Sequence, residues 1–392
     1  MPDELSPGRV LLLAVTCCIV VANIYFNQSV LNLISADFPH DRHLISLIPM
    51  ATQLGYAAGL FFLVPLGDYR DRRQLIMRQA FGLCLSLAGV ILAPGAGWLV
   101  LFSFLTGMSA TVAQQIVPLA ASCSPAASRG RTVGNIMGGV LAGILAGRAI
   151  GGIIGQYYSW RCVYLIGGIM TLAAIILMSR ILPRQSVDVP SLRYPLILQS
   201  LRQLWREEPV VRTATLMQAA LFASFSLLWT ILPFWLQHRY HYGAGIAGIF
   251  ALLGLAGIAC APLAGRFSDR RGPIGVITFG TLLMGMAWGV FFLLDSAAGM
   301  LIGILLLDIG EQCALIANQH IIYSLRPDAR NRLNTLFMSG MFLGGAGGSV
   351  TATYLWEYGS AWSAITLAGL GLVLLAALSL LSGKYVRLRP RR

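Results

Sequence analysis

Three ionisable residues stand far from the ends of long apolar runs. Arg148 lies within residues 133–157, and Asp308 and Glu311 lie within residues 299–323. If these runs cross a bilayer, a charge at that depth costs at least about 2.5–3.5 kcal/mol, so such residues usually face a partner or a wet cavity. Desolvation raises a carboxyl pKa and a nearby arginine lowers it, so this set could take up and release protons. We predict Arg148, Asp308 and Glu311 as proton-coupling residues.

The three charges are expected at comparable depth. At a rise of about 1.5 Å per residue, Arg148 lies roughly 22 Å from the inner end of its run, and Asp308 and Glu311 roughly 14 and 18 Å from the outer end of theirs. Opposite charges in two halves of the chain could form a bond that exists in one orientation only. The alternative is that Arg148 pairs permanently with an acidic residue and locks two helices together.

Uncharged polar side chains form a second group. Buried amides need hydrogen-bond partners, which can be substrate and water or merely a neighbouring helix. Phe222, Phe225 and Trp229 follow one another at i, i+3 and i+7, a face that could hold an apolar or aromatic substrate, although packing or lipid contact is the commoner role of such stripes. The predicted substrate-contacting residues are Asn23, Asn27, Gln28, Gln114, Gln115, Trp229, Asn318 and Gln319.

Composition indicates which elements hold these residues. Apolar residues make up 57% of the 392 positions and charged residues 11%, which is too apolar for a water-exposed surface. A spanning helix needs roughly 20 apolar residues, so the length suits about twelve spans. We predict an all-α membrane protein of twelve transmembrane helices in two pseudo-symmetric six-helix bundles. The predicted spans are 10–35, 44–66, 75–94, 97–120, 133–157, 162–182, 211–236, 244–264, 274–294, 299–323, 334–357 and 361–382.

A polar interval separates the sixth span from the seventh. It is too polar to enter lipid and long enough to lie along the surface as an amphipathic segment. The predicted organisation is an N-terminal bundle (1–183), a cytoplasmic central loop (184–210) and a C-terminal bundle with a basic tail (211–392).

The net charge of +13 reflects orientation in the membrane. The basic residues lie between apolar runs, which argues against nucleic acid as a partner. With both termini in the cytoplasm, the inner connections collect nearly all of them and the outer ones only Arg42, Arg161 and Arg239, as the positive-inside rule requires. We predict a multi-pass protein of a cell membrane, the bacterial inner membrane, with both termini cytoplasmic.

The two halves repeat at a spacing of about 201 residues. Asp68 and the arginines after it recur as Asp269, Arg270 and Arg271, and Trp160 recurs as Trp362. The paired amides Gln114 and Gln115 correspond to Asn318 and Gln319. Parallel repeats of this kind commonly build a transporter from two similar bundles.

With these motifs the whole chain resembles the major facilitator superfamily. The family's loop signature between spans 2 and 3, G-x-L-a-D-r-x-G-r-k, reads VPLGDYRDRR at 64–73, and a second copy reads GRFSDRRG at 265–272. The resemblance implies that these loops belong to an inner gate, and it implies that spans 1, 4, 7 and 10 line a central cavity. The gating residues it implies are Asp68, Arg72, Asp269 and Arg270.

Span 5 resembles the antiporter signature of the same superfamily. Gly134, Gly143 and Gly147 keep its glycine spacing, the pair 151–152 keeps its end, and Arg148 stands where the signature has proline. This implies export by exchange. The family's proton-coupling arginine of span 4 would fall on Ser103 and is absent from the sequence.

The hypothesis is a proton-coupled exporter of a small, amphiphilic or weakly acidic solute that works by alternating access. An importer or exchanger of an organic anion, with Arg148 as carboxylate clamp, is the alternative, and a non-transporting membrane sensor is a remote one. The sequence has no HExxH, GxSxG or P-loop motif, so we do not expect an enzyme. We expect no cofactor or metal, and we expect a monomer whose partners are its substrate, protons and lipid.

Overall fold

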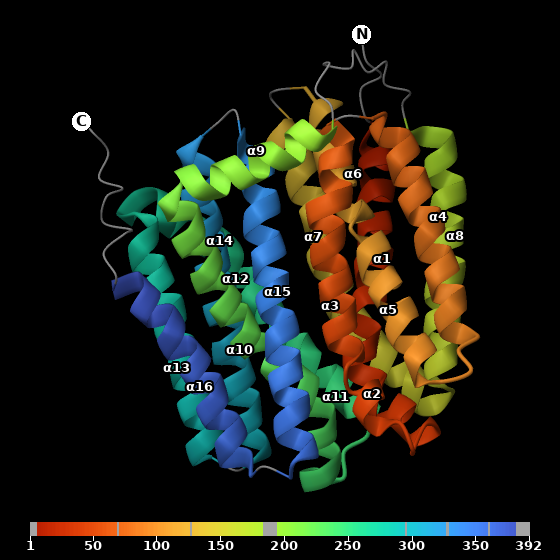
Figure 1. Cartoon of the computed structure of the whole chain (residues 1–392), viewed down its shortest axis with the longest axis vertical. Helices are drawn as coiled ribbons and strands as arrows, with labels where there is room; N and C mark the ends of the chain where they lie inside the picture. The colour runs from red at the N-terminus through yellow and green to blue at the C-terminus, as the bar shows by residue number, and fades with distance from the viewer. Residues whose placement is uncertain are drawn as a thin grey trace. The chain divides into compact units, whose positions relative to one another are not determined.

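The computed structural model describes residues 6–68, 70–125, 128–182, 194–294, 296–326, 329–359 and 361–381 (Figure 1). All regular structure in these ranges is helical. The chain divides into two compact units, an N-terminal unit of Met1–Ile197 with Pro233–Ala251 and a C-terminal unit of Leu198–Leu232 with Leu252–Arg392. The predicted loop at 184–210 remains a prediction, and its residues 184–193 lie outside the described ranges.

Most elements fall wholly in one unit, while α9 (Tyr194–Glu207), α10 (Pro209–Tyr240) and η3 (Ala251–Leu253) contribute residues to both. The N-terminal unit holds α1 (Pro7–Asp37), α2 (Arg42–Ile45), α3 (Ile48–Ala58), η1 (Gly59–Leu63), η2 (Val64–Asp68), α4 (Arg72–Ile91), α5 (Ala96–Ala110), α6 (Val112–Ser122), α7 (Arg129–Tyr157), α8 (Trp160–Ile181) and α11 (Ala244–Phe250). The C-terminal unit holds α12 (Gly254–Arg271), α13 (Pro273–Leu293), α14 (Ala297–Leu325), α15 (Arg330–Glu357) and α16 (Trp362–Leu381).

Eleven stretches of the described chain are long and apolar enough to cross a membrane. The remaining predicted span, 334–357, corresponds to α15, whose 28 residues exceed the roughly 20 that a crossing needs. Glycine, serine and threonine lower the hydropathy of α15, which is not among the eleven. The same small residues serve its packing.

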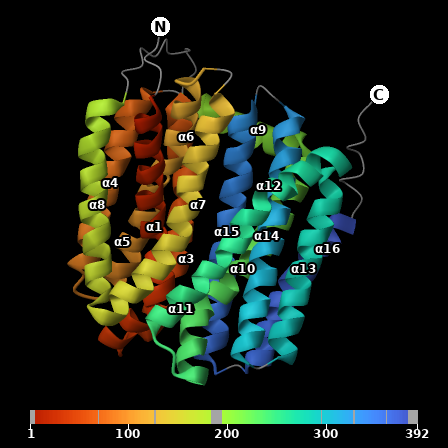
Figure 2. The same ribbon diagram turned by 180° about the vertical axis from the view of Figure 1, so that it is seen from behind.

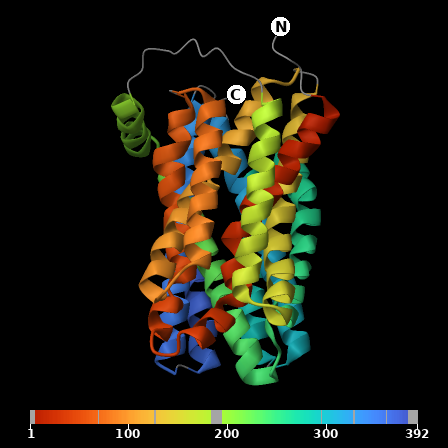
Figure 3. The same ribbon diagram turned by 90° about the vertical axis from the view of Figure 1, so that its right-hand side faces the viewer.

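In the N-terminal unit, α7 packs closely against α1 through glycine. A Cβ atom added at Gly143 or Gly147 would collide with a backbone carbonyl oxygen of α1, that of Cys18 or Ala22 respectively. Small residues allow such backbone contact, which replaces the hydrophobic drive that lipid does not supply. Figure 3 shows the helices of this unit from the side, with roughly parallel axes.

In the C-terminal unit, α15 packs against α10 in the same manner. A Cβ atom at Gly344 or Gly348 would meet the carbonyl oxygen of Ala219 or Ala223. Each glycine and each partner is displaced by 201 residues from its counterpart in the N-terminal unit, so the repeat seen in the sequence is also a repeat of helix packing. Figure 2 shows α13, α14 and α16 of this unit side by side.

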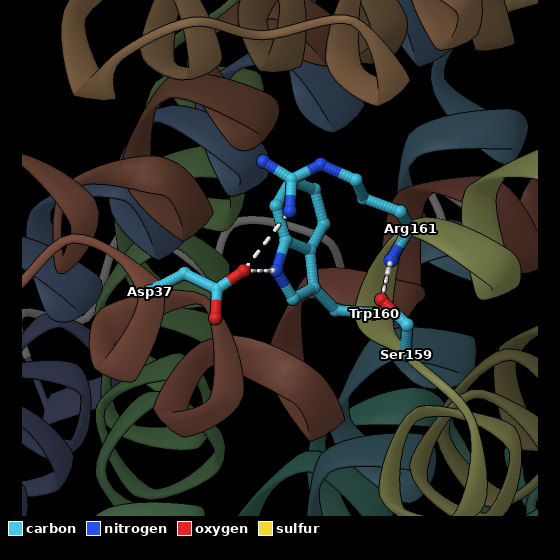
Figure 4. Close-up of polar contacts among 4 residues, drawn as sticks. All are labelled: Asp37, Ser159, Trp160 and Arg161. Carbon is cyan, nitrogen blue, oxygen red and sulfur yellow. Dashed lines mark hydrogen bonds and ion pairs between the residues drawn. The ribbon is translucent and has the colours of Figure 1, made fainter.

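The ends of α1 and α8 are joined by a polar contact (Figure 4). Asp37 Oδ2 accepts hydrogen bonds from Trp160 Nε1 at 2.7 Å and from Arg161 Nη1 at 3.0 Å. The Arg161 guanidinium lies 4.2 Å from the centre of the Trp160 ring, and Ser159 Oγ accepts from the Arg161 amide. A cap, an ion pair and a cation–π contact therefore hold α8 at its first turn.

Candidate functional site

Arg148 is buried in the N-terminal unit, with 2% of its surface exposed. Its Nε donates to Gln28 Oε1 at 2.7 Å, which ties α7 to α1. Its guanidinium carbon lies 4.9 Å from the centre of the Tyr25 ring. The glycines on either side of Arg148 bring the two helices close enough for this contact. Two predicted residues, Arg148 and Gln28, are thus direct partners.

Two other predicted amides on α1 bond to neighbouring helices of the N-terminal unit. Asn23 Nδ2 donates to Thr171 Oγ1 of α8 at 3.1 Å, and Asn27 Nδ2 donates to Thr52 Oγ1 of α3 at 2.9 Å. Both amides are buried. The amide row of α1 therefore contacts three different helices, α7, α8 and α3.

The paired amides Gln114 and Gln115 of α6 have different surroundings. Gln115 is buried, and its Nε2 donates to the carbonyl oxygens of Leu63 and Val64, at the junction of the π-helical η1 and the 3₁₀-helical η2. Such irregular turns release backbone groups that need partners, and Gln115 supplies one. Gln114 is partly exposed and donates to Tyr56 Oη at 3.2 Å.

In the C-terminal unit, three buried side chains form a chain of hydrogen bonds. Gln218 Nε2 of α10 donates to Glu311 Oε1 of α14 at 2.7 Å. Asn318 Nδ2, two turns further along α14, donates to Gln218 Oε1 at 2.9 Å. Gln218 and Asn318 are fully buried and Glu311 is 3% exposed. The second carboxyl oxygen of Glu311, Oε2, is buried without a hydrogen-bond partner among the described residues.

The other predicted polar residues of α14 turn toward different neighbours. Asp308, one turn before Glu311, is 5% exposed and packs by its backbone near Gly257 of α12. Gln319 is partly exposed, and its Nε2 lies 3.6 Å from the sulfur of Met338 in α15. The side chains of Glu311 and Asn318 therefore meet α10 and that of Gln319 meets α15, while the backbone of Asp308 lies beside α12.

The aromatic residues predicted on span 7 pack on one another. The ring centres of Phe222 and Phe225 are 5.7 Å apart with nearly parallel planes, and Trp229 follows at 6.1 Å from Phe225. Phe342 of α15 packs edge-on against Phe222 at 5.2 Å. Trp229 is buried. Aromatic packing thus connects α10 with α15.

The four predicted gating residues differ in how they are held. Arg72 begins α4, and its Nε donates to the carbonyl oxygen of Gly67 at 3.0 Å. Asp269 Oδ1 lies 3.3 Å from His320 Nδ1 of α14, and Arg270 is exposed. The side chain of Asp68 lies outside the described side chains.

Sequence reasoning missed Gln218, Tyr25, whose ring contacts Arg148, and Tyr56, whose hydroxyl group accepts from Gln114. Gln218 is a single amide in an apolar run, and that isolation was the available signal. The two tyrosines gave no signal in the sequence, because tyrosine is common in membrane spans. Among the described residues no three His, Cys, Asp or Glu side chains come close enough to hold a metal ion.

Comparison with known proteins identifies the family. The model of the Major Facilitator Superfamily matches residues 12–310 and, in a second match, residues 214–392. The chain belongs to the major facilitator superfamily. It is therefore a multi-pass secondary transporter of that superfamily and not an enzyme. It is 36% identical over 371 residues to the "Uncharacterized transporter YgaY" of Escherichia coli O157:H7, with 93% of each chain covered.

Other relatives of this superfamily member are more distant. "Probable transporter SCO4007" of Streptomyces coelicolor is 31% identical over 368 residues, covering 93% of this chain and 85% of the relative. "Multidrug resistance protein B homolog" of Mycobacterium tuberculosis is 27% identical over 172 residues, covering 42% of this chain and 31% of the relative.

Solved structures confirm the predicted fold class, an all-α membrane protein of twelve spans in two pseudo-symmetric six-helix bundles. A bacterial homologue of the human lysosomal transporter Spinster matches with a TM-score of 0.77 and 17% identity, covering 97% of this chain and 98% of that one. A point mutant of the nucleoside transporter NupG matches with a TM-score of 0.75 and 11% identity over 95% of this chain and 98% of that one. At these identities the likeness concerns the fold alone.

Proposed function

We propose that this transporter exchanges protons for a small molecule and that Asp308 and Glu311 carry the protons. The observation behind the proposal is a pair of carboxyl groups one turn apart on α14, both at least nine-tenths buried. An ionised carboxylate at membrane depth is costly, so such groups persist where gaining and losing a proton is useful. The bare Oε2 of Glu311 offers a place for that proton.

The direction we propose is export, by alternating access. The antiporter-like glycines of α7 support it, because Gly143 and Gly147 make the backbone contacts that their spacing implies. The partial similarity to a protein named for multidrug resistance also supports it. We propose a small amphiphilic or weakly acidic solute, and a monomer in the bacterial inner membrane with both termini cytoplasmic.

The predicted substrate-contacting residues fall into two groups. Asn23, Asn27 and Gln115 donate to neighbouring helices, so we assign them mainly to holding helices in place. Gln114 and Gln319 are partly exposed and make longer contacts, at 3.2 and 3.6 Å, which a solute could replace. Gln28 and Asn318 are bonded to Arg148 and Gln218, and Trp229 packs on Phe225; these three residues complete the proposed set. Asp68, Arg72, Asp269 and Arg270 remain proposed as gating residues.

Transport in inside-out membrane vesicles tests the proposal. A panel of solutes is offered with and without an imposed pH gradient, for the wild type, Asp308→Asn and Glu311→Gln. We expect at least one of the two substitutions to abolish pH-driven accumulation, since neither amide can carry a proton. Asp41→Asn is the matched control, because the Asp41 side chain makes no capping hydrogen bond. Full pH-driven flux in both variants would disprove the proton-carrier assignment.

The buried guanidinium of Arg148 supports a second candidate, import or exchange of an organic anion that Arg148 clamps by its carboxylate. Arg148→Lys keeps the charge and loses the planar fork, which is not conservative at a bidentate site. Reduced anion affinity with intact proton release would favour the clamp. Arg161→Lys, at an exposed arginine, is the control.

A further inference from the structure

Gln218 lies within the apolar run of α10 and has no exposed surface. Its side chain connects two residues of α14, Glu311 and Asn318, which are seven positions apart and therefore on one helix face about 10.5 Å apart along the axis. A buried amide costs free energy unless all its polar atoms are paired. Here each end of the amide has a partner, so Gln218 is held in a defined orientation.

Gln218 lies with its amide oxygen toward Asn318 and its NH₂ group toward Glu311. An amide side chain has an accepting oxygen at one end and a donating NH₂ group at the other. Asn318 Nδ2 donates to Gln218 Oε1, so the oxygen of the Gln218 amide faces Asn318. The NH₂ group is then directed at Glu311. A flipped Gln218 would set two NH₂ groups against each other and an amide oxygen against a carboxyl oxygen.

This arrangement makes the two oxygens of Glu311 different. Oε1 accepts from Gln218 at 2.7 Å, and an oxygen that accepts this hydrogen bond is a poor place for a proton. Oε2 is buried and has no hydrogen-bond partner among the described residues. Asp308 interacts electrostatically with Glu311 from the same helix. Cys260 of α12 interacts in this way with Cys313.

We propose that Gln218 is a positioning residue for proton transfer, which holds Glu311 by Oε1 so that the proton binds and leaves at Oε2. Asn318 supports this role, because its hydrogen bond to Gln218 keeps the NH₂ group of Gln218 directed at the carboxyl group of Glu311. The inference rests on the proposed role of Glu311 as a proton carrier. It adds a residue on a different helix, so that movement of α10 against α14 within the C-terminal unit changes how readily Glu311 is protonated.

Infrared difference spectroscopy of the purified full-length protein in lipid nanodiscs tests this without a substrate. The carbonyl band of protonated Glu311 is identified as the band that appears on acidification in the wild type and is missing in Glu311→Gln. In Gln218→Met, which keeps the side-chain length and lacks the donor, we expect this band at higher wavenumber because its carbonyl oxygen has lost a hydrogen bond. An unshifted band would overturn the proposal.

The pH at which the band reaches half its height provides a second readout. A hydrogen bond to a charged group favours the ionised form by an amount equivalent to about 1–2 pH units, so we expect Gln218→Met to move the midpoint upward by about that much. Asn318→Leu should move it in the same direction by less, since Gln218 remains but is free to rotate. An unchanged midpoint in both variants contradicts the proposal.

Ser224→Ala is the matched control. Ser224 is also fully buried on α10 and also bridges two partners, accepting from Trp288 Nε1 at 2.6 Å and donating to the carbonyl oxygen of Gly369 at 3.1 Å. If Gln218 only holds helices together, Ser224→Ala and Gln218→Met should disturb the spectrum alike. If Glu311→Gln removes no band on acidification, the proton-carrier role itself fails. If Glu311 gives a band and Gln218→Met does not shift it, the positioning role of Gln218 is wrong while the proton-carrier role of Glu311 stands.

Discussion

The two units repeat the same helix packing but carry different chemistry on it. Gly143 of α7 against Cys18 of α1 is matched, 201 residues later, by Gly344 of α15 against Ala219 of α10. In each pair a glycine faces a backbone carbonyl oxygen, a contact that tolerates no side chain. The backbone scaffold is therefore duplicated, and the polar side chains are where the units differ.

The difference is clearest at a polar pair that both units have. In the N-terminal unit Gln28 accepts from Arg148 at 2.7 Å. In the C-terminal unit Ser349, the counterpart of Arg148, accepts at 2.9 Å from Thr230, which follows Trp229, the counterpart of Gln28. The first pair contains a charge that persists at every accessible pH, while the second is neutral. The same helix contact thus holds a permanent cation in one unit and two hydroxyl groups in the other.

The carboxyl groups show the reverse asymmetry. Asp308 and Glu311 belong to the C-terminal unit, and the residues 201 positions earlier are Gly107 and Ala110. The two buried carboxyl groups among the described residues therefore both lie on α14, with Gln218 of α10 beside Glu311, while the N-terminal unit holds the buried guanidinium of Arg148. The two units therefore share a packing framework and differ at a few buried polar positions.

The largest effect is expected from filling the shared glycine contacts. Gly143→Ala and Gly344→Ala each force a methyl group against a backbone carbonyl oxygen, and overpacking of this kind costs about 1–3 kcal/mol or prevents folding. Thermal unfolding in detergent, followed by size-exclusion chromatography, measures the loss. Gly138→Ala and Gly347→Ala are the controls on the same two helices, because a Cβ atom there meets nothing within 4 Å. If the substitution lowered stability in one unit only, the two units would not share the same helix packing.

A smaller effect distinguishes the two polar pairs. Gln28→Leu removes a partner of a buried guanidinium, and hydrogen bonds to charged groups contribute about 1.5–3 kcal/mol. Thr230→Val removes a hydrogen bond between neutral hydroxyl groups, which contributes about 0.5–1.5 kcal/mol. The unfolding temperature of Gln28→Leu should therefore fall further. Equal losses would mean that the hydrogen bond between Gln28 and Arg148 stabilises the fold no more than a bond between neutral groups.

Much of the fold could be predicted from the sequence because lipid imposes simple rules. Long apolar runs, the positions of arginines and the 201-residue repeat indicated twelve spans. Eleven stretches of the described chain qualify as spans, α15 corresponds to the remaining one, and solved transporter structures share the fold. α15 shows the limit of hydropathy as a signal, since glycines such as Gly344 and Gly348 make it less apolar while they serve its packing. The irregular turns at 59–68 were not predicted, because a π-turn depends on neighbours such as Gln115.

The site could be predicted only in part. Burial of Arg148, Asp308 and Glu311 follows from their depth in apolar runs, so the sequence identified them. Their partners did not follow, because a helix face is predictable from spacing whereas the helix it meets is not. Gln28 is therefore predicted as a substrate contact and found bonded to Arg148, while the bond of Gln218 to Glu311 has no counterpart in the sequence pattern.

The smallest effect concerns the exposed ion pairs of the two units. Arg326 lies 2.6 Å from Glu208 and 3.2 Å from Glu207, and these carboxylates, Glu208 first, raise the pKa of its guanidinium. Arg161 pairs with Asp37, and Trp160 remains as a donor to Asp37 when the arginine is removed. Arg326→Gln leaves two adjacent carboxylates without this cation, so it should lower the unfolding temperature slightly more than Arg161→Gln. Since the Debye length shrinks to about 3 Å at about 1 M salt, the difference should disappear there. A difference that persists at high salt would mean that packing of the Arg326 stem, rather than its charge, separates the two variants.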